Sequence, residues 1–255
     1  VYNFGKSYPL KTRLTMAEQI PMIGEKFPLY KQFSLATTED VFGKDALAKA
    51  DHFQANTLAS SYIENNGNGT FTVKQLPAEA QFSCIYGIIP FDVNNDGNLD
   101  LIAHGNFFSP ESETERQDGC IGITLIGDGK GNFKSMKVKE SGFFSNKDAK
   151  ALAMIYMGKD ELPVILGTNN NDAMFAYEFR HYTQNRVLLT QHDRFAEIFY
   201  KDGKKARYEV NIGSGYLSQG SNSISFVPAL IDKITVTNQK GEQRNVFENP
   251  IVAYK

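Results

Sequence analysis

Oxygen-bearing side chains occupy every second position of one short stretch of this sequence, and a glycine follows the third of them. The stretch reads "DVNNDGNLD", and the side chains belong to Asp92, Asn94, Asp96, Asn98 and Asp100. Oxygens at alternate positions followed by a glycine let a short loop wrap around a hard cation such as Ca²⁺, which takes about 6–8 oxygen ligands. The sequence therefore predicts a calcium site in which Asn98 contributes its backbone carbonyl, the other four contribute side chains, and water completes the shell.

The residues after the loop distinguish it from an EF-hand. The twelfth position is Ala103 and not the bidentate Glu that an EF-hand requires. The segment 101–105, "LIAHG", alternates like a strand, so the loop is expected to join two strands. Mg²⁺ suits the loop less well, because it demands a rigid octahedron and retains its waters. The alternative interpretation is an Asx-rich turn without a metal.

The chain around the loop divides into a helical part and a longer β-like part. Segment 10–55 shows no period-2 alternation, and Pro21 and Pro28 interrupt it, which favours several short helices. Capping-box patterns predict helix starts at Thr15 with Glu18 and at Thr37 with Asp40. From residue 58 onward, short apolar runs alternate with Asn, Gly and Asp clusters, as is typical of strands and turns. Further on, two hairpins are predicted, with turns at Asp202-Gly203 and Lys240-Gly241.

The β-like part repeats itself. Segments 64–71, "ENNGNGTF", and 126–133, "IGDGKGNF", share Gly-x-Gly-x-Phe at an offset of 62 residues, and the same offset superposes 101–106 on 163–168. We infer two copies of one four-stranded unit, as in a β-propeller blade. The offset places the loop side chains on residues without carboxylates, namely Met154, Tyr156, Gly158 and Leu162. Because the second copy does without the acids, they indicate a specific ligand in the first.

At these residues the chain resembles the FG-GAP/VCBS repeat family, whose blades are similar to those of integrin α-subunit propellers. The resemblance covers about 58–189 and rests on "DVNNDGNLDLIAHGN". It implies a structural calcium ion that holds the loop between the two innermost strands of a blade. By this resemblance that role falls to Asp92, Asn94, Asp96, Asn98 and Asp100.

The last part of the chain resembles the UnbV/ASPIC domain. The resemblance rests on "GSGYLSQ" (213–219) within "NIGSGYLSQGSNSISF" and on the segment "IDKITVTNQKGEQRNVF". Two features depart from that family: "FVPAL" replaces its usual Phe-Gly-Leu-Gly, and Thr237 or Asn238 stands where a tryptophan is usual. Combining the two modules is similar to exported bacterial proteins of the Bacteroidetes type, in which a helical insertion can separate blades.

These observations predict a mainly β fold, with a partial β-propeller, an N-terminal helical insertion and a C-terminal β-sandwich-like domain. The expected domains are 1–57, the end of a preceding blade with the insertion; 58–189, the FG-GAP/VCBS-type blades; and 190–255, the UnbV/ASPIC-like domain. A closed propeller has about 4–8 blades, so we expect this chain to be a fragment whose remaining blades complete the ring.

The two cysteines are predicted to be free thiols. Blade topology would place Cys84 at the start of the first strand and Cys120 at the start of the third. Strands two apart are separated by roughly 9–10 Å, and a disulfide requires Cα atoms within about 7 Å.

Composition and motifs narrow the function. The net charge of −2 and the lack of a basic stretch argue against nucleic-acid binding. No apolar run approaches a membrane span of about 20 residues, and no signal peptide follows Val1, so an exported protein would have been trimmed. No hydrolase, nucleotide-binding or zinc-protease motif occurs, and the histidines at positions 52, 104, 181 and 192 lie apart.

The predicted function is therefore a non-catalytic module that binds protein or carbohydrate, with Ca²⁺ as a structural ion. The expected location is extracellular, at the outer-membrane surface or in the periplasm. A purely structural assembly module remains the first alternative. A polysaccharide-acting enzyme, or its accessory domain, is the second, in which acids such as Glu113 and Glu115 would act on a glycan.

Overall fold

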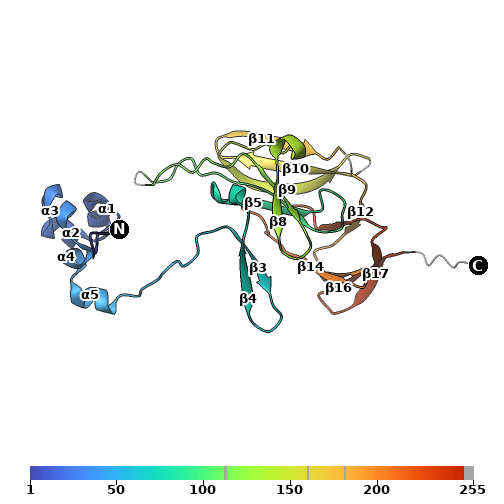
Figure 1. Ribbon diagram of the computed structural model, residues 1–255, viewed down its shortest axis with the longest axis horizontal. Helices are drawn as coiled ribbons and strands as arrows, with labels where there is room; N and C mark the ends of the chain where they lie inside the picture. The colour runs from blue at the N-terminus through green and yellow to red at the C-terminus, as the bar shows by residue number, and fades with distance from the viewer. Residues whose placement is uncertain (112–113, 160, 181, 250–255) are drawn as a thin grey trace, which may run out of the picture. The chain divides into compact units, whose positions relative to one another are not determined.

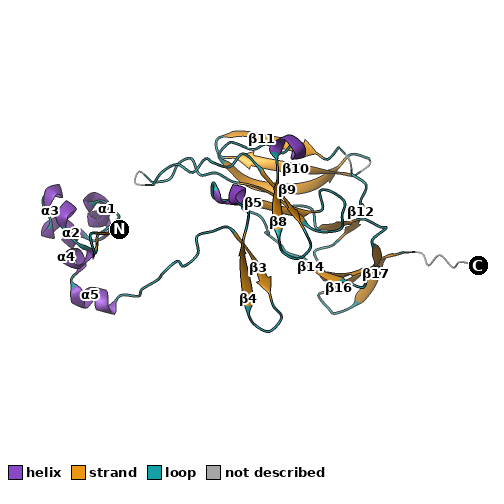
Figure 2. Cartoon of the chain, in the orientation of Figure 1, coloured by secondary structure: helices purple, strands orange, loops and turns teal. Residues whose placement is uncertain are grey.

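The computed structural model describes residues 1–111, 114–159, 161–180 and 182–249. The chain divides into two compact units, Val1–Leu58 and Ala59–Lys255. The first unit contains nearly all of the described helix, and the second is built from strands (Figure 2). None of the described helices combines the length and the apolarity that crossing a bilayer requires.

Short helices make up the first unit, as the prolines predicted. They are α1 (Arg13–Gln19), α2 (Pro21–Lys26), α3 (Tyr30–Leu35), α4 (Thr38–Phe42) and α5 (Lys44–Lys49), preceded by a small hairpin of β1 (Tyr2–Asn3) and β2 (Lys6–Ser7). The apolar side chains that they bury form one core around Ile23, Phe33 and Val41. This unit therefore has a core of its own.

The predicted helix starts are right in one case and wrong in the other. Thr37 and Asp40 form the predicted capping box, with Asp40 N–H donating to Thr37 Oγ1 at 3.1 Å and Thr37 N–H donating to an Asp40 carboxylate oxygen at 2.9 Å. The first helix is capped by Thr12, whose hydroxyl accepts from Thr15 N–H at 3.3 Å. Thr15 thus lies inside the helix, because the hydroxyl three residues earlier is already placed to cap it.

The second unit confirms the prediction of a mainly β fold. Its strands form several small antiparallel sheets, and none of them closes into a barrel within the described part of the chain. The first strands of this unit are β3 (Ser61–Asn65), β4 (Phe71–Gln75), β5 (Gly87–Phe91), β6 (Asp100–His104), β7 (Ile123–Gly127), β8 (Phe133–Met136), β9 (Ala149–Met157), β10 (Leu162–Asn169) and β11 (Asp172–Glu178). Two single helical turns interrupt them, η1 (Ala78–Gln81) and α6 (Val138–Ser141).

Two of these sheets pack face to face. One has the strand order β5-β6-β7-β8 and the other β11-β10-β9. Their facing side chains form a shared core that includes Phe91 and Ile102 from the first sheet and Leu152 and Ile165 from the second. The opposite face of the first sheet buries Ala103, Ile123 and Leu125 in a separate core. Strand β6 is therefore buried on both faces and β5 on one, and the loop that joins them starts from two packed strands.

The repeated turn segments form equivalent hairpins. In the first, Asn65 pairs with Phe71, and in the second Gly127 pairs with Phe133, so the register is the same at the 62-residue offset. Asp100 and Leu162, which the offset also equates, each begin a strand. The ungapped alignment is wrong between these points. It equates Asp92 with Met154, but Met154 lies inside β9 and pairs with Ile165, because the second copy closes a shorter loop.

The end of the chain adds two further sheets. They are built from β12 (Asn185–Leu188), β13 (Asp193–Tyr200), β14 (Lys205–Glu209), β15 (Ser223–Phe226), β16 (Ile231–Asn238) and β17 (Gln243–Glu248). The sheets β14-β13-β16-β17 and β12-β15 enclose one core around Ala196, Ile234 and Val236. Figure 1 labels β12, β14, β16 and β17 toward the C-terminal end of the chain. The two hairpins predicted at Gly203 and Gly241 are confirmed, and both glycines adopt positive φ.

Both cysteines are free, as predicted. They precede strands β5 and β7 instead of beginning them, since β5 begins at Gly87 and β7 at Ile123.

Candidate metal site

The acidic loop begins where β5 ends and finishes where β6 begins. Phe91 and Asp100 are directly opposite each other on the paired strands, so the loop spans 92–99. Asn95 (φ 61°) and Gly97 (φ 86°) adopt left-handed backbone conformations that turn the chain back on itself. The strand–loop–strand arrangement expected from the sequence is therefore present.

The first and last carboxylates of the loop are buried and hold its backbone. Asp92 is 7% exposed, and its two oxygens accept from Asp96 N–H at 3.1 Å and Gly97 N–H at 2.9 Å. Asp100 is 0% exposed, and its oxygens accept from Val93 N–H at 2.8 Å and from Gly127 N–H, on strand β7, also at 2.8 Å. Asp100 thus joins the loop to a strand other than the two that the loop connects.

The middle residues of the loop bond to one another. Asn94 Oδ1 accepts from Asp96 N–H at 3.1 Å, and Asp96 Oδ1 accepts from Asn98 N–H at 2.8 Å. Asn94 Nδ2 also donates to Asp96 Oδ2 at 3.0 Å. The Asn94 and Asp96 side chains are exposed. The loop therefore presents amide and carboxylate oxygens at the surface above two buried carboxylates.

Gln184 supports the loop from a distant part of the sequence. Its Nε2 donates to the Asp92 carbonyl oxygen at 2.6 Å and to Asn95 Oδ1 at 2.9 Å. The side chain is 7% exposed, and its Oε1 is buried without a hydrogen-bond partner among the described residues. Nothing in the sequence pointed to Gln184, because a contact between segments so far apart leaves no local pattern.

The electrostatics of the loop are those of an uncompensated acidic site. Burial raises the pKa of Asp92 and of Asp100 above the ordinary value, and the nearby Asp96 charge raises both further, while hydrogen bonds from backbone N–H groups oppose the shift. No Lys or Arg forms an ion pair with any of the three carboxylates in the part of the chain that the structure describes. A bound cation would supply the missing positive charge.

The donor set fits a hard cation, but the carboxylates do not all converge. No three His, Cys, Asp or Glu side chains within 1–111, 114–159, 161–180 and 182–249 are grouped so as to hold a metal ion. Asp92 and Asp100 both turn their two oxygens toward backbone N–H groups. Asn94 and Asp96 present the oxygens at the loop surface, and the ligand roles of Asp92, Asn94, Asp96, Asn98 and Asp100 stay predictions. An all-oxygen, anionic set is the chemistry that Ca²⁺ prefers.

The histidines that the structure describes do not lie together in one site. His104 is fully buried, its ring nitrogens lie 3.0 Å from Ser145 Oγ and 3.1 Å from the Ala151 carbonyl oxygen, and burial lowers its pKa to about 4. It is a neutral core histidine at pH 7. His52 and His192 are exposed on separate segments. His181 and Glu113 lie outside the described residues, so the Glu113–Glu115 pair has no described geometry.

A second buried polar cluster, not anticipated from the sequence, lies where β6 ends. Asn106 Nδ2 donates to the carbonyl oxygens of Cys120 at 2.9 Å and Lys147 at 2.8 Å, and its Oδ1 accepts from Cys120 N–H at 3.0 Å. Lys150 Nζ donates to the Asn106 carbonyl oxygen at 2.6 Å and pairs with Asp148 at 2.7 Å. Every polar atom named in this cluster has a partner, so the cluster offers no open ligand position. Its hydrogen bonds connect the segments that follow β6 and precede β7 and β9.

No protein-family model matches the chain, and no curated protein matches it. The interpretation of its function therefore rests on the geometry of its own residues.

Proposed function

We propose that the chain is a non-catalytic binding module of the FG-GAP/VCBS type in which a structural Ca²⁺ ion holds the loop between β5 and β6. The ion would be held by the oxygens of Asp92, Asn94 and Asp96, with Asn98 and Asp100 completing the set. Its role would be to keep two strands of a blade in register.

The buried pair of carboxylates carries the proposal. Asp92 and Asp100 are almost inaccessible, and no cationic side chain among the described residues is paired with either of them. Burying a carboxylate without a counter-charge costs free energy that backbone hydrogen bonds offset only in part. A divalent ion would offset the remainder, and it would reverse the upward pKa shift of both groups.

The expected affinity favours a location outside the cytoplasm. The loop offers few carboxylates, and Asn94 and Asp96 are exposed to solvent. Sites of this kind in extracellular modules bind Ca²⁺ with dissociation constants of about 10⁻⁴–10⁻³ M. Such a site fills where calcium is millimolar, which supports an extracellular, outer-membrane or periplasmic protein.

The blade interpretation is supported by the repeated hairpins and by the packing of sheets. Two hairpins match at a fixed offset, and consecutive sheets pack face to face around a shared core. Both features are expected of neighbouring propeller blades. In this proposal the remaining blades belong to a longer chain, and the last two sheets form the UnbV/ASPIC-like domain.

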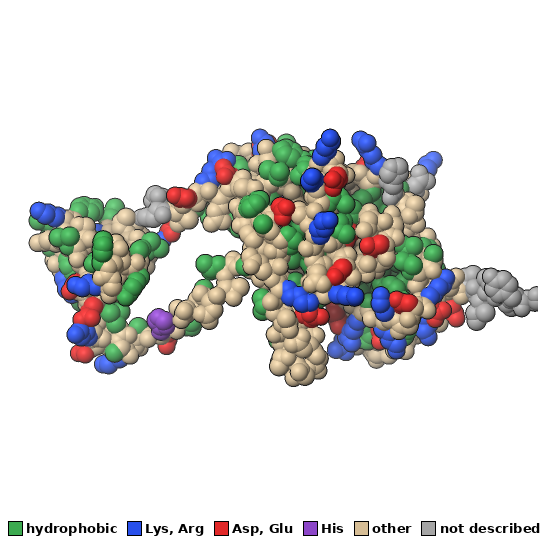
Figure 3. Space-filling model, viewed as in Figure 1, with side chains coloured by type: hydrophobic (Ala, Val, Ile, Leu, Met, Phe, Trp, Pro, Cys, Tyr) green, Lys and Arg blue, Asp and Glu red, His purple; other side chains and the backbone are tan. Residues whose placement is uncertain are grey.

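The ligand of the module would be a protein or a carbohydrate. A rigid β scaffold that presents loops is suited to recognition. Figure 3 shows Lys and Arg side chains mixed with Asp and Glu on the visible face of the second unit, without a large patch of one sign. Together with the net charge of −2, this mixture favours partners other than nucleic acid.

Thermal unfolding of the full chain with and without calcium tests the proposal. At a Ca²⁺ concentration 100 times the dissociation constant, binding stabilises the folded state by about 2.7 kcal/mol. For a unit of this size that corresponds to a rise in Tm of roughly 5–10 °C, which EDTA should abolish and Mg²⁺ should not reproduce.

A variant and a matched control assign the effect to the loop. Asp96→Asn should lose most of the calcium-induced rise, whereas Asp128→Asn, in the exposed turn between β7 and β8, should keep it. A wild-type Tm that does not respond to calcium, or a response that both variants retain, contradicts a structural ion at this loop.

A further inference from the structure

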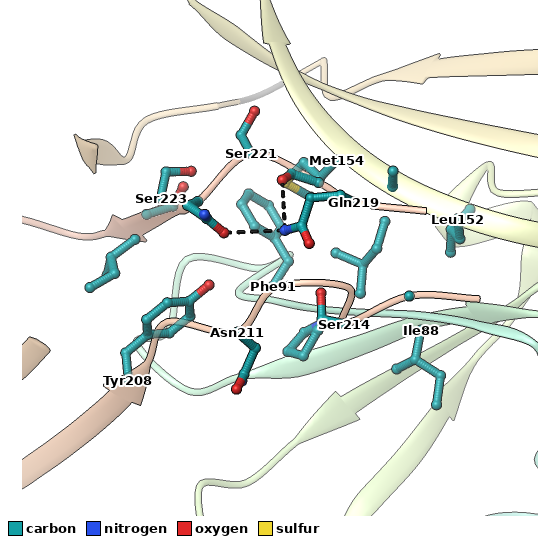
Figure 4. Close-up of a pocket in the computed structure, with 18 of the residues that line it drawn as sticks. Ile88, Phe91, Leu152, Met154, Tyr208, Asn211, Ser214, Gln219, Ser221 and Ser223 are labelled. Carbon is teal, nitrogen blue, oxygen red and sulfur yellow. Dashed lines mark hydrogen bonds between the residues drawn. The ribbon is translucent and has the colours of Figure 1, made fainter. Parts of the chain in front are cut away.

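A pocket of about 410 Å³ lies between the blade-like sheets and the segment 211–225 (Figure 4). One side is formed by strands β5 and β9, and the other by the segment itself together with Tyr208 of β14. Its size falls in the range of small-molecule sites, roughly 300–1,000 Å³. None of the residues proposed for catalysis or for the metal accounts for this pocket, although Asp92 lies at its border.

The segment is an ordered wall of the pocket. Ser221 N–H donates to the Met154 carbonyl oxygen at 2.8 Å and so occupies the free edge of β9 at that point. A Cβ atom at Gly220 would lie only 3.0 Å from the same carbonyl oxygen, so the close approach favours glycine. The Tyr216 ring packs edge-on against Tyr86 at 5.0 Å between centroids. The wall is therefore fixed to both facing sheets.

The Gln219 side chain organises the wall from within. Its Oε1 accepts from Gly213 N–H, and its Nε2 donates to Asn222 Oδ1 at 3.2 Å. At the tip between these contacts, Leu217 adopts a left-handed backbone (φ 45°) and is 90% exposed. A leucine rarely adopts this conformation, and such strain is concentrated at functional segments.

Several hydroxyl groups that line the pocket have no partner. Ser218 Oγ is buried and forms no hydrogen bond within the described part of the chain. The hydroxyl groups of Tyr208 and Ser214 also form no hydrogen bond with the described residues, but Tyr208 is half-buried and Ser214 is exposed. Because Ser218 Oγ is closed off even from solvent, a ligand in the pocket would bond to the accessible hydroxyl groups of Tyr208 and Ser214.

The rest of the lining is apolar apart from two acids at the border. Leu152 and Met154 lie on the β9 side, and Phe91 appears between the two walls in Figure 4. Of the two acids, Glu209 pairs with Arg207 at 2.6 Å, and the Asp92 oxygens accept from backbone N–H groups of its loop. The pocket therefore offers hydroxyl and amide groups on one side, apolar surface on the other, and no Lys or Arg among the described residues that line it.

We propose that this pocket binds a neutral sugar unit, an inference that specifies the ligand and site of the binding module proposed above. A sugar ring presents hydroxyl groups at its edge and C–H groups on its faces, which match the two kinds of lining. An extended peptide would add to a sheet edge through its backbone, but Ser221 already occupies the β9 edge at Met154. An anionic ligand would find no Lys or Arg among the described residues that line the pocket.

Binding of oligosaccharides to the full chain tests this inference. An array of neutral, acidic and sulfated glycans comes first, and calorimetry with the best neutral hit and its constituent monosaccharide follows. Tyr208→Phe removes one hydroxyl group and should weaken binding about three- to tenfold, as expected for the loss of one hydrogen bond. Ser214→Trp places a large side chain on the exposed wall and should abolish binding.

Tyr62→Phe is the matched control, because Tyr62 lines a different cavity beside strands β3 and β7. It should bind as the wild type does, and Tm values close to that of the wild type should show that all variants fold. Binding of no neutral glycan, preference for acidic glycans, or full binding by the Tyr208 and Ser214 variants overturns the proposal.

The calcium-dependent Tm separates this outcome from failure of the proposed function. If the Tm responds to calcium but no neutral glycan binds, the structural ion is supported and the sugar site is rejected. If sugar binds at this pocket but the Tm does not respond to calcium, the sugar site is supported and the structural ion is rejected.

Discussion

The two copies of the repeat close the same pair of strands in different ways. In the second copy, β9 and β10 remain paired up to Met157 and Leu162, and a short turn containing Gly158 joins them. In the first copy, pairing stops at Phe91 and Asp100, and the side chains of a longer loop replace it. Asp92 and Asp100 accept the backbone N–H groups that cross-strand carbonyls would otherwise accept. The carboxylates of Asp92 and Asp100 thus take the place of strand pairing. Their negative charges remain to be neutralised.

Among equivalent substitutions in the two copies, removing the Asp100 side chain should give the largest difference in unfolding free energy. Asp100→Ala leaves two backbone N–H groups unsatisfied, those of Val93 and Gly127, in a fully buried place. We expect a loss of about 3–5 kcal/mol in the free energy of unfolding, measured by urea denaturation. The equivalent change in the second copy, Leu162→Ala, alters a partly exposed side chain and should cost about 1 kcal/mol. Equal losses would mean that Asp100 does not hold the loop.

The strands that follow the two loops should differ in their response to acid. The offset equates His104 in β6 with Leu166 in β10. Between its ordinary pKa of 6.5 and its folded pKa of about 4, His104 is protonated in the unfolded chain only. Its contribution to stability is therefore complete above pH 6.5 and is lost as the pH falls toward 4, by roughly 3 kcal/mol.

His104→Leu tests this contribution by installing the residue of the second copy. The raised pKa values of Asp92 and Asp100 act in the opposite sense, since those groups take up protons first in the folded state. The informative quantity is therefore the difference between the wild-type and His104→Leu curves of unfolding free energy against pH. The unfolding free energy of the wild type, relative to that of His104→Leu, should fall as the pH drops from 6.5 to 4.5. A constant difference would show that His104 is not held neutral.

Replacing the turn glycines with alanine should give a smaller difference in stability between the two copies. Gly97 and Gly158 both have positive φ, so alanine at either position is strained by about 1–2 kcal/mol. A Cβ atom at Gly97 would also contact Leu230, whereas nothing lies within 4 Å of one at Gly158. We expect Gly97→Ala to lower the Tm more than Gly158→Ala. The reverse order would show that the longer loop is the more adaptable of the two.

The smallest effect concerns Asp96 without calcium. Its side chain is exposed, and its charge raises the pKa of both buried neighbours. Asp96→Asn should therefore change the unfolding free energy by no more than about 0.5 kcal/mol in EDTA, with stabilisation favoured. A loss well above that value in EDTA would mean that Asp96 supports the loop through its own hydrogen bonds and not through a cation.

Local patterns were sufficient to predict much of the fold. Gly203 and Gly241 located two hairpins, Thr37 with Asp40 located a helix start, and the repeated Gly-x-Gly-x-Phe located two equivalent turns. Each depends on residues close in sequence, where backbone sterics and side-chain caps decide the conformation. The misplaced start at Thr15 shows the limit of such patterns, since an equally suitable cap stood three residues earlier.

Long-range contacts could not be predicted from local patterns. The residue types of the loop indicated its chemistry. Its hydrogen bonds with distant segments left no local pattern, and neither did the bond that places Ser221 on strand β9: Gln184 donates to the Asp92 carbonyl oxygen, Gly127 N–H donates to Asp100, and Ser221 N–H donates to the Met154 carbonyl oxygen. The ungapped repeat also concealed the shorter loop of the second copy, because composition alone does not reveal where strand pairing resumes.

Calorimetric titration of the full chain with CaCl₂ tests the central claim most directly, with the Asp92→Asn/Asp96→Asn double variant as reference. The account predicts one Ca²⁺ ion bound per wild-type chain, with a dissociation constant of about 10⁻⁴–10⁻³ M, and no binding to the folded double variant. Absence of binding heat in the wild type, or an identical titration of the double variant, would contradict it.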